Sequence, residues 1–314
     1  MQSTFVYLGE LFGVFFAGML LAVAVGRERF HRVTAILLMF SLYLLLFFMG
    51  VNTARIEGIY SMLGSMGLSA FLLTISAVAG SFVLGLGYDV IKKRRSGFSG
   101  ESQSPKSHLM SISLSSLKSP LSMVLCVAVG MVLQTFLPSA VNWYFESSVD
   151  ALLFSMMGLV GMQMMQNEVN WKSILRSFDI LMLPVLTILG SYLGIMIYAL
   201  FSDFSVRQCL AMVSGFGWYS MSGVLITNAG FPVMGTISFL ANLMREMLGF
   251  FLVPLLGLWF PRRALLAICV SGTSSMDFLL PLIKQNYCIE AVPKAIIHGC
   301  IIAFFVPILI PIWL

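Results

Sequence analysis

Charged residues are scarce in this 314-residue chain, at 10% of the sequence, whereas soluble domains carry about 25%. This scarcity excludes an ordinary soluble globular protein. Apolar residues make up 59% of the sequence. They recur along the whole chain in runs of about 20, the length needed to cross a bilayer core of about 30 Å. The composition therefore predicts a polytopic, all-α membrane protein.

Residue patterns typical of enzymes and metal sites are also missing. The chain has three histidines and contains neither HExxH nor GxSxG, the motifs of zinc proteases and serine hydrolases. Its five cysteines are odd in number and include no CxxC pair, so neither a disulfide framework nor a metal site is indicated. We therefore expect no enzyme activity, no cofactor and no metal.

Ten apolar stretches are long enough to span a bilayer, and two of them are interrupted. The continuous ones are 5–25, 33–54, 62–88, 119–138, 149–167, 179–201, 234–259 and 292–313. The interrupted ones are 207–230, which contains SGFGWYSMSG (214–223), and 264–286, which contains SGTSSMD (271–277). We expect about eight transmembrane helices plus two re-entrant or broken-helix hairpins.

Loop charge predicts the orientation. With the N-terminus outside, eleven Lys and Arg residues fall in cytoplasmic loops and two in outer loops, which satisfies the positive-inside rule. If 207–230 crossed the membrane, Arg262 and Arg263 would lie outside, whereas a re-entrant hairpin keeps them cytoplasmic. Both termini are therefore predicted to be periplasmic. Because topology explains the net charge of +5, no nucleic-acid partner is expected.

Short motifs recur along the chain. FFMGVN (47–52) and AGSF (79–82) match GLVGMQ (158–163) and LGSY (189–192) at offsets of 111 and 110 residues. This offset contains three spans, an odd number, so the second copy is inverted. VSG (213–215) with FFLVP (250–254) likewise resembles VSG (270–272) with FFVP (304–307). Inverted repeats with interrupted helices that meet near the midplane are typical of secondary transporters.

The repeats divide the chain into four segments. A first three-span unit occupies 1–95, and a serine-rich, basic cytoplasmic linker occupies 96–118. The linker follows a KKRR run that is expected to lie on anionic headgroups. A second three-span unit, the inverted copy, covers 119–203. Two hairpin-plus-span units at 204–314 are expected to form the transport core.

The first interruption is predicted to line a substrate cavity. Non-helical backbone persists at membrane depth only beside protein or a water-filled cavity. Glycines permit a sharp turn, serines supply hydroxyls and exposed backbone, and the two aromatic rings can flank a cation. The predicted substrate-binding residues are Ser214, Gly215, Gly217, Trp218, Tyr219, Ser220 and Ser222. The alternative is a turn outside the membrane with its aromatic residues in the interfacial belt.

Two adjacent charges, Arg245 and Glu246, lie in the middle of the span at 234–259. A charge at that depth costs about 2.5–3.5 kcal/mol on insertion scales, so it is rarely without a role. We expect Glu246 to face the substrate together with Asn242, which shares its helix face. Arg245 is expected to pair elsewhere or to orient backbone carbonyls. The alternative is an internal ion pair that only locks two spans together.

The second interruption adds Ser274, Ser275 and a carboxylate, Asp277. An acid at a broken helix attracts a cation and exchanges protons, so all three are predicted to bind substrate. The alternative is that Asp277 caps a helix at the cytoplasmic surface. His298 is interpreted as a satisfied or interfacial side chain in preference to a proton relay.

Longer strings carry a family resemblance. They are LLLFFMGV (44–51), SGFGWYSMSG (214–223), NLMREM (242–247), SSMDFLLP (274–281), VPKAIIHG (292–299) and FFVPILI (304–310). In these strings the chain resembles the bacterial lysine exporter family, LysO. The resemblance implies export of L-lysine, and of analogues such as thialysine, and it implies that Glu246 is a required intramembrane acid. The family often carries a further acid beside the position of Asn242, where this chain departs.

These observations predict a secondary transporter that exports L-lysine across the bacterial inner membrane by proton antiport. Glu246 and Asp277 are expected to exchange a proton for the substrate's ammonium group, while N–H groups of a hairpin take its carboxylate. The expected partners are L-lysine, protons and the lipid bilayer, and no oligomeric state is predicted. The alternative is a cation- or proton-coupled transporter of another small solute, such as sodium or an organic acid.

Overall fold

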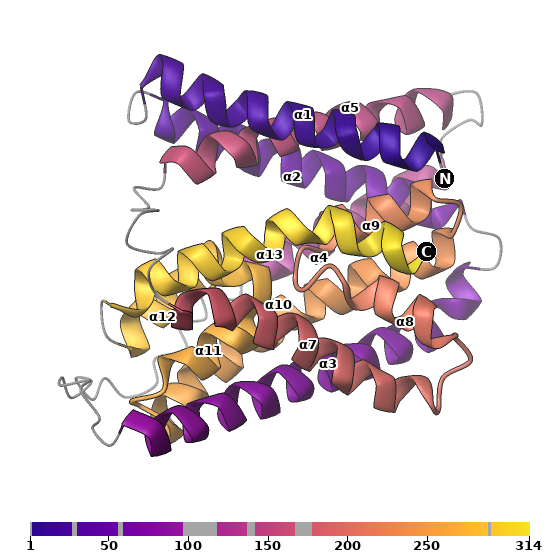
Figure 1. The fold of residues 1–314 in the computed structure, drawn as a ribbon. Coiled ribbons are helices and arrows are strands. Elements are labelled where there is room, and N and C mark those ends of the chain that lie inside the picture. The colour runs from indigo at the N-terminus through magenta and orange to yellow at the C-terminus, as the bar shows by residue number, and fades with distance from the viewer. Residues whose placement is uncertain are drawn as a thin grey trace. The chain divides into compact units, whose positions relative to one another are not determined.

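The computed structural model describes residues 2–26, 30–55, 59–96, 118–136, 142–166, 178–287 and 290–314. Within these ranges all regular elements are helices (Figure 1). A long helix occupies each of the eight stretches expected to span: α1 (Gln2–Val25), α2 (His31–Ala54), α3 (Ile59–Ser96), α4 (Lys118–Gln134), α5 (Asn142–Gln166), α7 (Phe178–Ala199), α10 (Pro232–Trp259) and α13 (Ala291–Trp313).

Five helices, α2, α3, α7, α10 and α13, are long and apolar enough to cross a membrane. Several present large apolar side chains outward, such as Ile36 on α2 (67% exposed) and Ile197 on α7 (66% exposed). Such side chains are stable against lipid and costly against water. The chain is therefore an all-helical, multi-pass membrane protein, as its composition predicts.

The chain forms two compact units. The first comprises Met1–Leu63 and Leu121–Val169. Glycines set its helix crossings: Gly18 of α1 lies against the carbonyl of Gly158 on α5, and Gly50 of α2 lies against the carbonyl of Val127 on α4. Small residues allow helix backbones to approach closely where no aqueous hydrophobic effect drives association.

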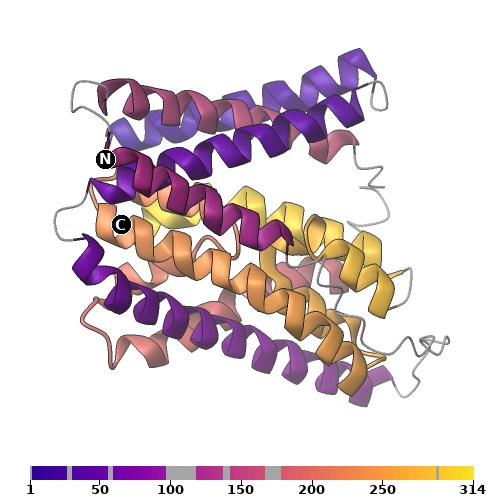
Figure 2. The ribbon, with the colours of Figure 1, turned by 180° about the vertical axis from the view of Figure 1, so that it is seen from behind.

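The second unit comprises Gly64–Pro120 and Asn170–Leu314. Helices α3 and α7 cross at glycines, so closely that a Cβ atom on Gly190 would lie 2.7 Å from the carbonyl oxygen of Gly80. Helix α13 (yellow) lies on the side of this unit shown in Figure 1, and α10 (orange) is seen in Figure 2. The helices that contain the two sequence interruptions contact both α10 and α13.

The first interrupted helix consists of α8 (Val206–Val213) and α9 (Tyr219–Asn228). A capping box fixes the start of α8, because the Ser205 hydroxyl accepts from the Gln208 amide and the Gln208 side chain accepts from the Ser205 amide. Helix α9 runs antiparallel to α10: Gly223 lies beside Gly235, near the start of α10, and the earlier Ser222 bonds Asn242 further along it. Helix α8 begins at this same end, because Arg207 bonds the Ile312 carbonyl near the end of α13, and the first turns of α13 pack against the second half of α10. The chain therefore turns back at 214–218.

The second interrupted helix consists of α11 (Ala264–Ser271), the 3-10 turn η3 (Gly272–Met276) and α12 (Leu280–Asn286). The end of α11 lies at the middle of α10, where the Val270 carbonyl accepts a hydrogen bond from Arg245. Helix α12 then follows α10 toward its C-terminal end, with Leu279 against Gly249 and Asn286 against Gly257. This segment also turns back on itself.

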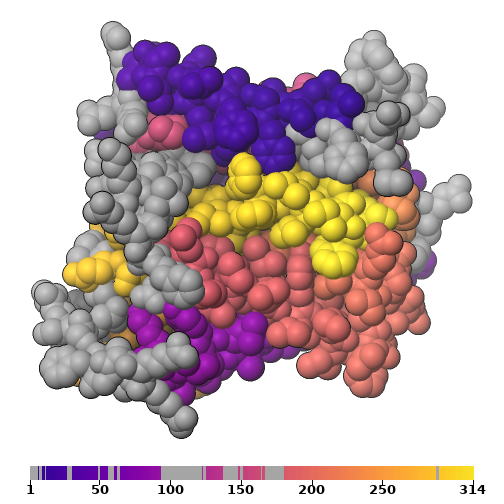
Figure 3. Space-filling model, in the orientation of Figure 1, coloured from indigo at the N-terminus to yellow at the C-terminus, as the bar shows by residue number. Residues whose placement is uncertain are grey.

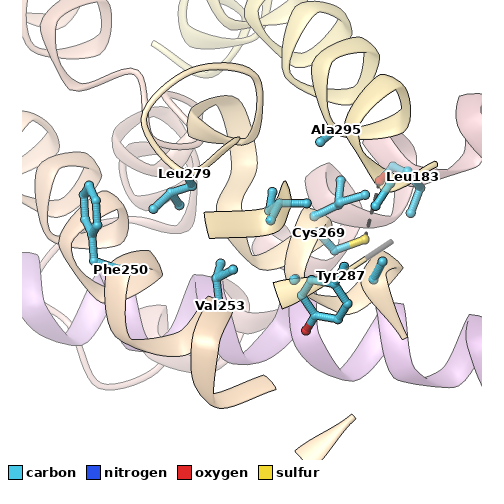
Figure 4. Packing of buried hydrophobic residues seen from close by; sticks show 12 residues of the cluster. Leu183, Phe250, Val253, Cys269, Leu279, Tyr287 and Ala295 are labelled. Carbon is cyan, nitrogen blue, oxygen red and sulfur yellow. Dashed lines mark hydrogen bonds between the residues drawn. The ribbon is translucent and has the colours of Figure 1, made fainter. Parts of the chain in front are cut away.

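An apolar cluster holds the second interrupted helix in place. It joins α7, α10, α11, α12 and α13 through the buried residues Leu183, Phe250, Val253, Cys269, Leu279, Tyr287 and Ala295 (Figure 4). On the face shown in Figure 3, the side chains of α13 (yellow) lie along those of α7 and α8. Packing on these sides holds the polar tips of the two broken helices in position.

Candidate functional site

The tips of the two broken helices meet inside the second unit. The carbonyl oxygen of Phe216 accepts hydrogen bonds from Thr273, at 2.9 Å from its backbone N–H and 3.2 Å from its hydroxyl. Gly272 has a φ of +61° and lies directly against the Phe216 carbonyl, and Gly217 has a φ of +107°. Only glycine tolerates these conformations and this closeness without strain.

Asn242 of α10 organises the first tip. Its Oδ1 accepts from the Gly217 amide at 2.8 Å, and its Nδ2 donates to the Met212 carbonyl and the Ser222 hydroxyl, both at 3.1 Å. A Cβ atom on Gly215 would lie 2.6 Å from Nδ2. Both the oxygen and the nitrogen of the buried Asn242 amide therefore bond the break between α8 and α9. Without Asn242, carbonyls at the end of α8 would lack hydrogen-bond donors.

Arg245 links the end of α11 to the crossing of α3 and α7. Its guanidinium donates to the Ser191 hydroxyl at 2.9 Å and to the Ser81 hydroxyl at 3.2 Å. It also donates to the carbonyls of Val270 and Cys269, at 3.2 and 3.3 Å. The side chain is 2% exposed. As expected, Arg245 orients backbone carbonyls, and the residues described include no Arg245–Glu246 ion pair.

Glu246 is bonded on one oxygen only. Its Oε2 accepts from the Ser274 hydroxyl at 2.9 Å, and the side chain is 1% exposed. Its Oε1 has no hydrogen-bond partner among the residues that the structure describes. A buried carboxylate oxygen without a partner is costly, so this atom is the natural acceptor for a proton or a cation.

A second buried titratable side chain lies next to the Glu246 contact. The His298 ring of α13 bonds the Ser275 hydroxyl through Nδ1 at 2.9 Å and the Thr187 hydroxyl through Nε2 at 2.8 Å. Each of these hydroxyls also donates to a backbone carbonyl, Ser275 to Ala295 at 2.9 Å and Thr187 to Cys269 at 3.3 Å. Consecutive serines, Ser274 and Ser275, thus hold Glu246 and His298.

The other predicted residues of the first interruption have separate surroundings. Ser214 bonds the Tyr192 hydroxyl at 2.8 Å and its own helix at the Leu210 carbonyl. The Tyr219 ring packs edge-on against Phe239 of α10, and Trp218 is partly buried. Ser220 is fully buried, and its hydroxyl has no partner in the described part of the chain.

Asp277 lies at the end of the second interruption. Its side chain is exposed, and its Oδ1 accepts from the neighbouring Phe278 amide at 2.6 Å. The N-cap residue of α12 is Leu279, so Asp277 does not occupy the capping position. No group of His, Cys, Asp and Glu side chains that could hold a metal ion occurs in the described ranges.

Sequence reasoning missed several members of this polar network. Ser81, Ser191 and Thr187 bring α3 and α7 to Arg245 and His298. The repeated strings AGSF and LGSY contain Ser81 and Ser191 and could have indicated these two residues. Thr187 gave none, because a single threonine in an apolar helix commonly bonds its own backbone.

Comparison with known proteins identifies the family. The family model described as "Lysine exporter LysO" matches residues 124–314. The chain belongs to the LysO family. It is 34% identical over 277 residues to "Lysine exporter LysO" of Escherichia coli strain K12, covering 87% of this chain and 88% of that protein. It is 36% identical over 159 residues to a "Putative lysine exporter" of Haemophilus influenzae, covering 51% and 80%. No solved structure matches the chain.

Proposed function

We propose that this LysO-family protein exports L-lysine, and analogues such as thialysine, across the bacterial inner membrane in exchange for protons. The names of both relatives support lysine as the substrate. The observation that carries the proposal is the Glu246 carboxylate, buried at the meeting tips with one oxygen unpartnered. The predicted binding residues of both tips surround the substrate in this proposal, with Asp277 as the second proton-exchanging acid.

Glu246 performs the exchange through its free oxygen. An ionised carboxylate left unpaired in a medium of low polarity is unstable, so the site favours a state in which Oε1 holds either a proton or an ammonium group. Binding of lysine on the cytoplasmic side displaces the proton, and protonation on the periplasmic side displaces lysine. The carrier with neither lysine nor a proton on Glu246 has an unpaired buried charge and is therefore high in free energy. Because this state is avoided, lysine export is coupled to proton entry.

Charge balance favours one proton per lysine. Moving a +1 solute outward against a cytoplasm-negative potential costs about 2.3 kcal/mol per 100 mV. Entry of one proton for each lysine that leaves cancels this electrical term, so the pH gradient drives export. We therefore expect transport to respond to collapse of the pH gradient and to be insensitive to the membrane potential alone.

The proposed topology has eight spans, two re-entrant hairpins and periplasmic termini, and the helix contacts support the inverted repeat of its first six spans. Under the repeat relation α1 corresponds to α4, α2 to α5 and α3 to α7. In keeping with this, α1 crosses α5 at Gly18 and Gly161, α4 crosses α2 at Gly130 and Gly50, and α3 crosses its own counterpart α7. Reciprocal crossings of this kind are expected of two inverted three-span units.

Efflux of preloaded labelled lysine tests the proposal. Cells that lack other exporters would carry the wild type, Glu246→Gln or Asp203→Asn at matched membrane levels. Asp203 is an exposed acid in the turn before α8 and serves as the control. We expect efflux from the wild type and Asp203→Asn, loss of efflux with Glu246→Gln, and loss of wild-type efflux when the pH gradient is collapsed.

Each part of the proposal has its own contrary result. Absence of wild-type lysine efflux would refute the substrate. Equal efflux with Glu246→Gln would make that carboxylate structural. Efflux that persists unchanged without a pH gradient would refute proton antiport while leaving lysine export in place.

A further inference from the structure

A carrier of amino acids must also hold the carboxylate group of its substrate, and two helix N-termini reach the meeting tips, those of α9 and α12. The donors at the start of α12 are already used. The N–H groups of Phe278, Leu279 and Leu280 bond Asp277 Oδ1, the Ser274 carbonyl and the Asp277 carbonyl. The next residue, Pro281, has no N–H group.

The first turn of α9 is different. Trp218 is its N-cap residue, and no side chain caps the helix. The Ser222 amide bonds the Trp218 carbonyl at 3.1 Å. The first N–H groups of a helix, here those of Ser220 and Met221, have no acceptor within the helix. The Ser220 hydroxyl has no partner among the described residues, and both residues are fully buried.

The tip that leads into α9 lies close to the residue that bonds Glu246. A Cβ atom on Gly217 would lie 3.3 Å from the Ser274 hydroxyl, and that hydroxyl bonds Glu246. The start of α9 and the Glu246 carboxylate therefore flank the same tip contact. One side of the contact offers unsatisfied donors with the positive end of a helix dipole, and the other offers an unsatisfied acceptor.

We propose that the first turn of α9, through the Ser220 hydroxyl and the N–H groups of Ser220 and Met221, binds the carboxylate of the transported amino acid while Glu246 binds an ammonium group. The inference rests on the proposed function. It specifies the substrate class that the site selects, an amino acid that carries both a carboxylate and an ammonium group. A diamine of the same length satisfies Glu246 but leaves the α9 donors buried and unbonded, so it is rejected.

Competition against labelled L-lysine in proteoliposomes tests this assignment. The competitors are L-lysine, lysinamide, which lacks the negative charge, and cadaverine, which lacks the whole carboxyl group. In the wild type we expect both analogues to compete at least about tenfold less well than lysine, the usual effect of losing a hydrogen bond to a charged group. This comparison requires no variant and so does not depend on how a mutant folds.

Ser220→Ala identifies the residue, with Ser271→Ala as the matched control. Ser271 is an equally buried serine on the opposite tip whose hydroxyl bonds its own helix at Ala267. Ser220→Ala is expected to raise the KM for lysine about tenfold and to leave inhibition by cadaverine unchanged, which also shows that the variant is folded. Ser271→Ala is expected to keep the wild-type preference.

Three results would overturn the assignment: cadaverine that competes as well as lysine in the wild type, an unchanged lysine KM in Ser220→Ala, or an equal loss of lysine and cadaverine binding in that variant. All three leave lysine export by the wild type intact. Failure of the wild type to transport lysine would refute the proposed function instead, so the two failures are distinguishable.

Discussion

The hydroxyl oxygens of Ser81 and Ser191, 110 positions apart in the sequence, lie 2.9 Å from each other where α3 crosses α7. Arg245 donates to both of them. The two serines occupy equivalent positions in the repeated strings AGSF and LGSY. A single guanidinium therefore bonds both copies of one motif and also the carbonyls at the end of α11, which ties the helix crossing to the second tip.

Replacement of Arg245 by lysine is expected to destabilise the protein. Lysine keeps the charge, but its ammonium group lacks the planar fork that reaches two hydroxyls and two carbonyls at once. We expect the free energy of unfolding to fall by at least about 2 kcal/mol, because buried acceptors lose charged donors. Thermal unfolding in detergent would measure this loss.

A double-mutant cycle locates the origin of that loss. Ser81→Ala with Ser191→Ala removes the two hydroxyl acceptors, so Arg245→Lys should cost less in that background than in the wild type. An equal cost in both backgrounds would show that the serines do not contribute to holding Arg245.

The glycines at the same crossing are expected to be intolerant of side chains. A Cβ atom on Gly190 would lie 2.7 Å from both the Gly80 carbonyl oxygen and the Ser81 Cα. Gly190→Ala should therefore separate α3 from α7 and lower stability by about 1–3 kcal/mol, the usual range for overpacking. The same unfolding assay measures it.

Gly67 on α3 supplies the control, because nothing lies within 4 Å of a Cβ atom placed there. Gly67→Ala should be neutral or stabilising, since alanine favours helix more than glycine does. If both variants lowered stability equally, the close crossing would not be the cause.

The sequence predicted much of the fold because membrane helices have a strong local signal. Apolar runs of sufficient length indicated all eight long helices and both interruptions. The direction of the chain after the first interruption was predicted only through Arg262 and Arg263, because charge in neighbouring loops carries that information.

The partners of the polar residues were less predictable, because they come from helices distant in the sequence. Periodicity placed Asn242 and Glu246 on one face of α10, but the amide of Asn242 holds the first tip and Glu246 bonds the second. Nothing local to His298 indicated Thr187, 111 positions away. Such pairs follow from tertiary packing and have no short-range pattern.

Asn242→Asp is expected to make transport sensitive to alkaline pH. The Asn242 amide donates to the carbonyls of Ser238 and Met212, at 2.8 and 3.1 Å. A protonated aspartic acid replaces one of these donors, whereas the ionised form places a negative charge against carbonyl oxygens. Efflux by the variant should therefore fall as pH rises, and more steeply than efflux by the wild type.

Asn286→Asp is the matched control for this change. Asn286 donates to the Leu282 carbonyl at 2.8 Å at the far end of α12 and is partly exposed. Water screens its charge, so the wild-type pH profile should be retained. If Asn242→Asp kept the wild-type pH profile of efflux, the amide donors of Asn242 would not be needed to hold the first tip.

Accessibility of single cysteines tests whether 207–230 enters and leaves on one side of the membrane. In a background without native cysteines, Asp203→Cys and Ala229→Cys flank this segment, and Arg262→Cys follows α10; all three positions are exposed. A re-entrant hairpin places 203 and 229 on the periplasmic side and 262 in the cytoplasm. A membrane-impermeant maleimide should therefore label the first two in intact cells and the third only after permeabilisation. Labelling of 203 and 229 from opposite sides would instead require a crossing. It would also reverse the orientation of α10, and with it the side from which lysine reaches Glu246.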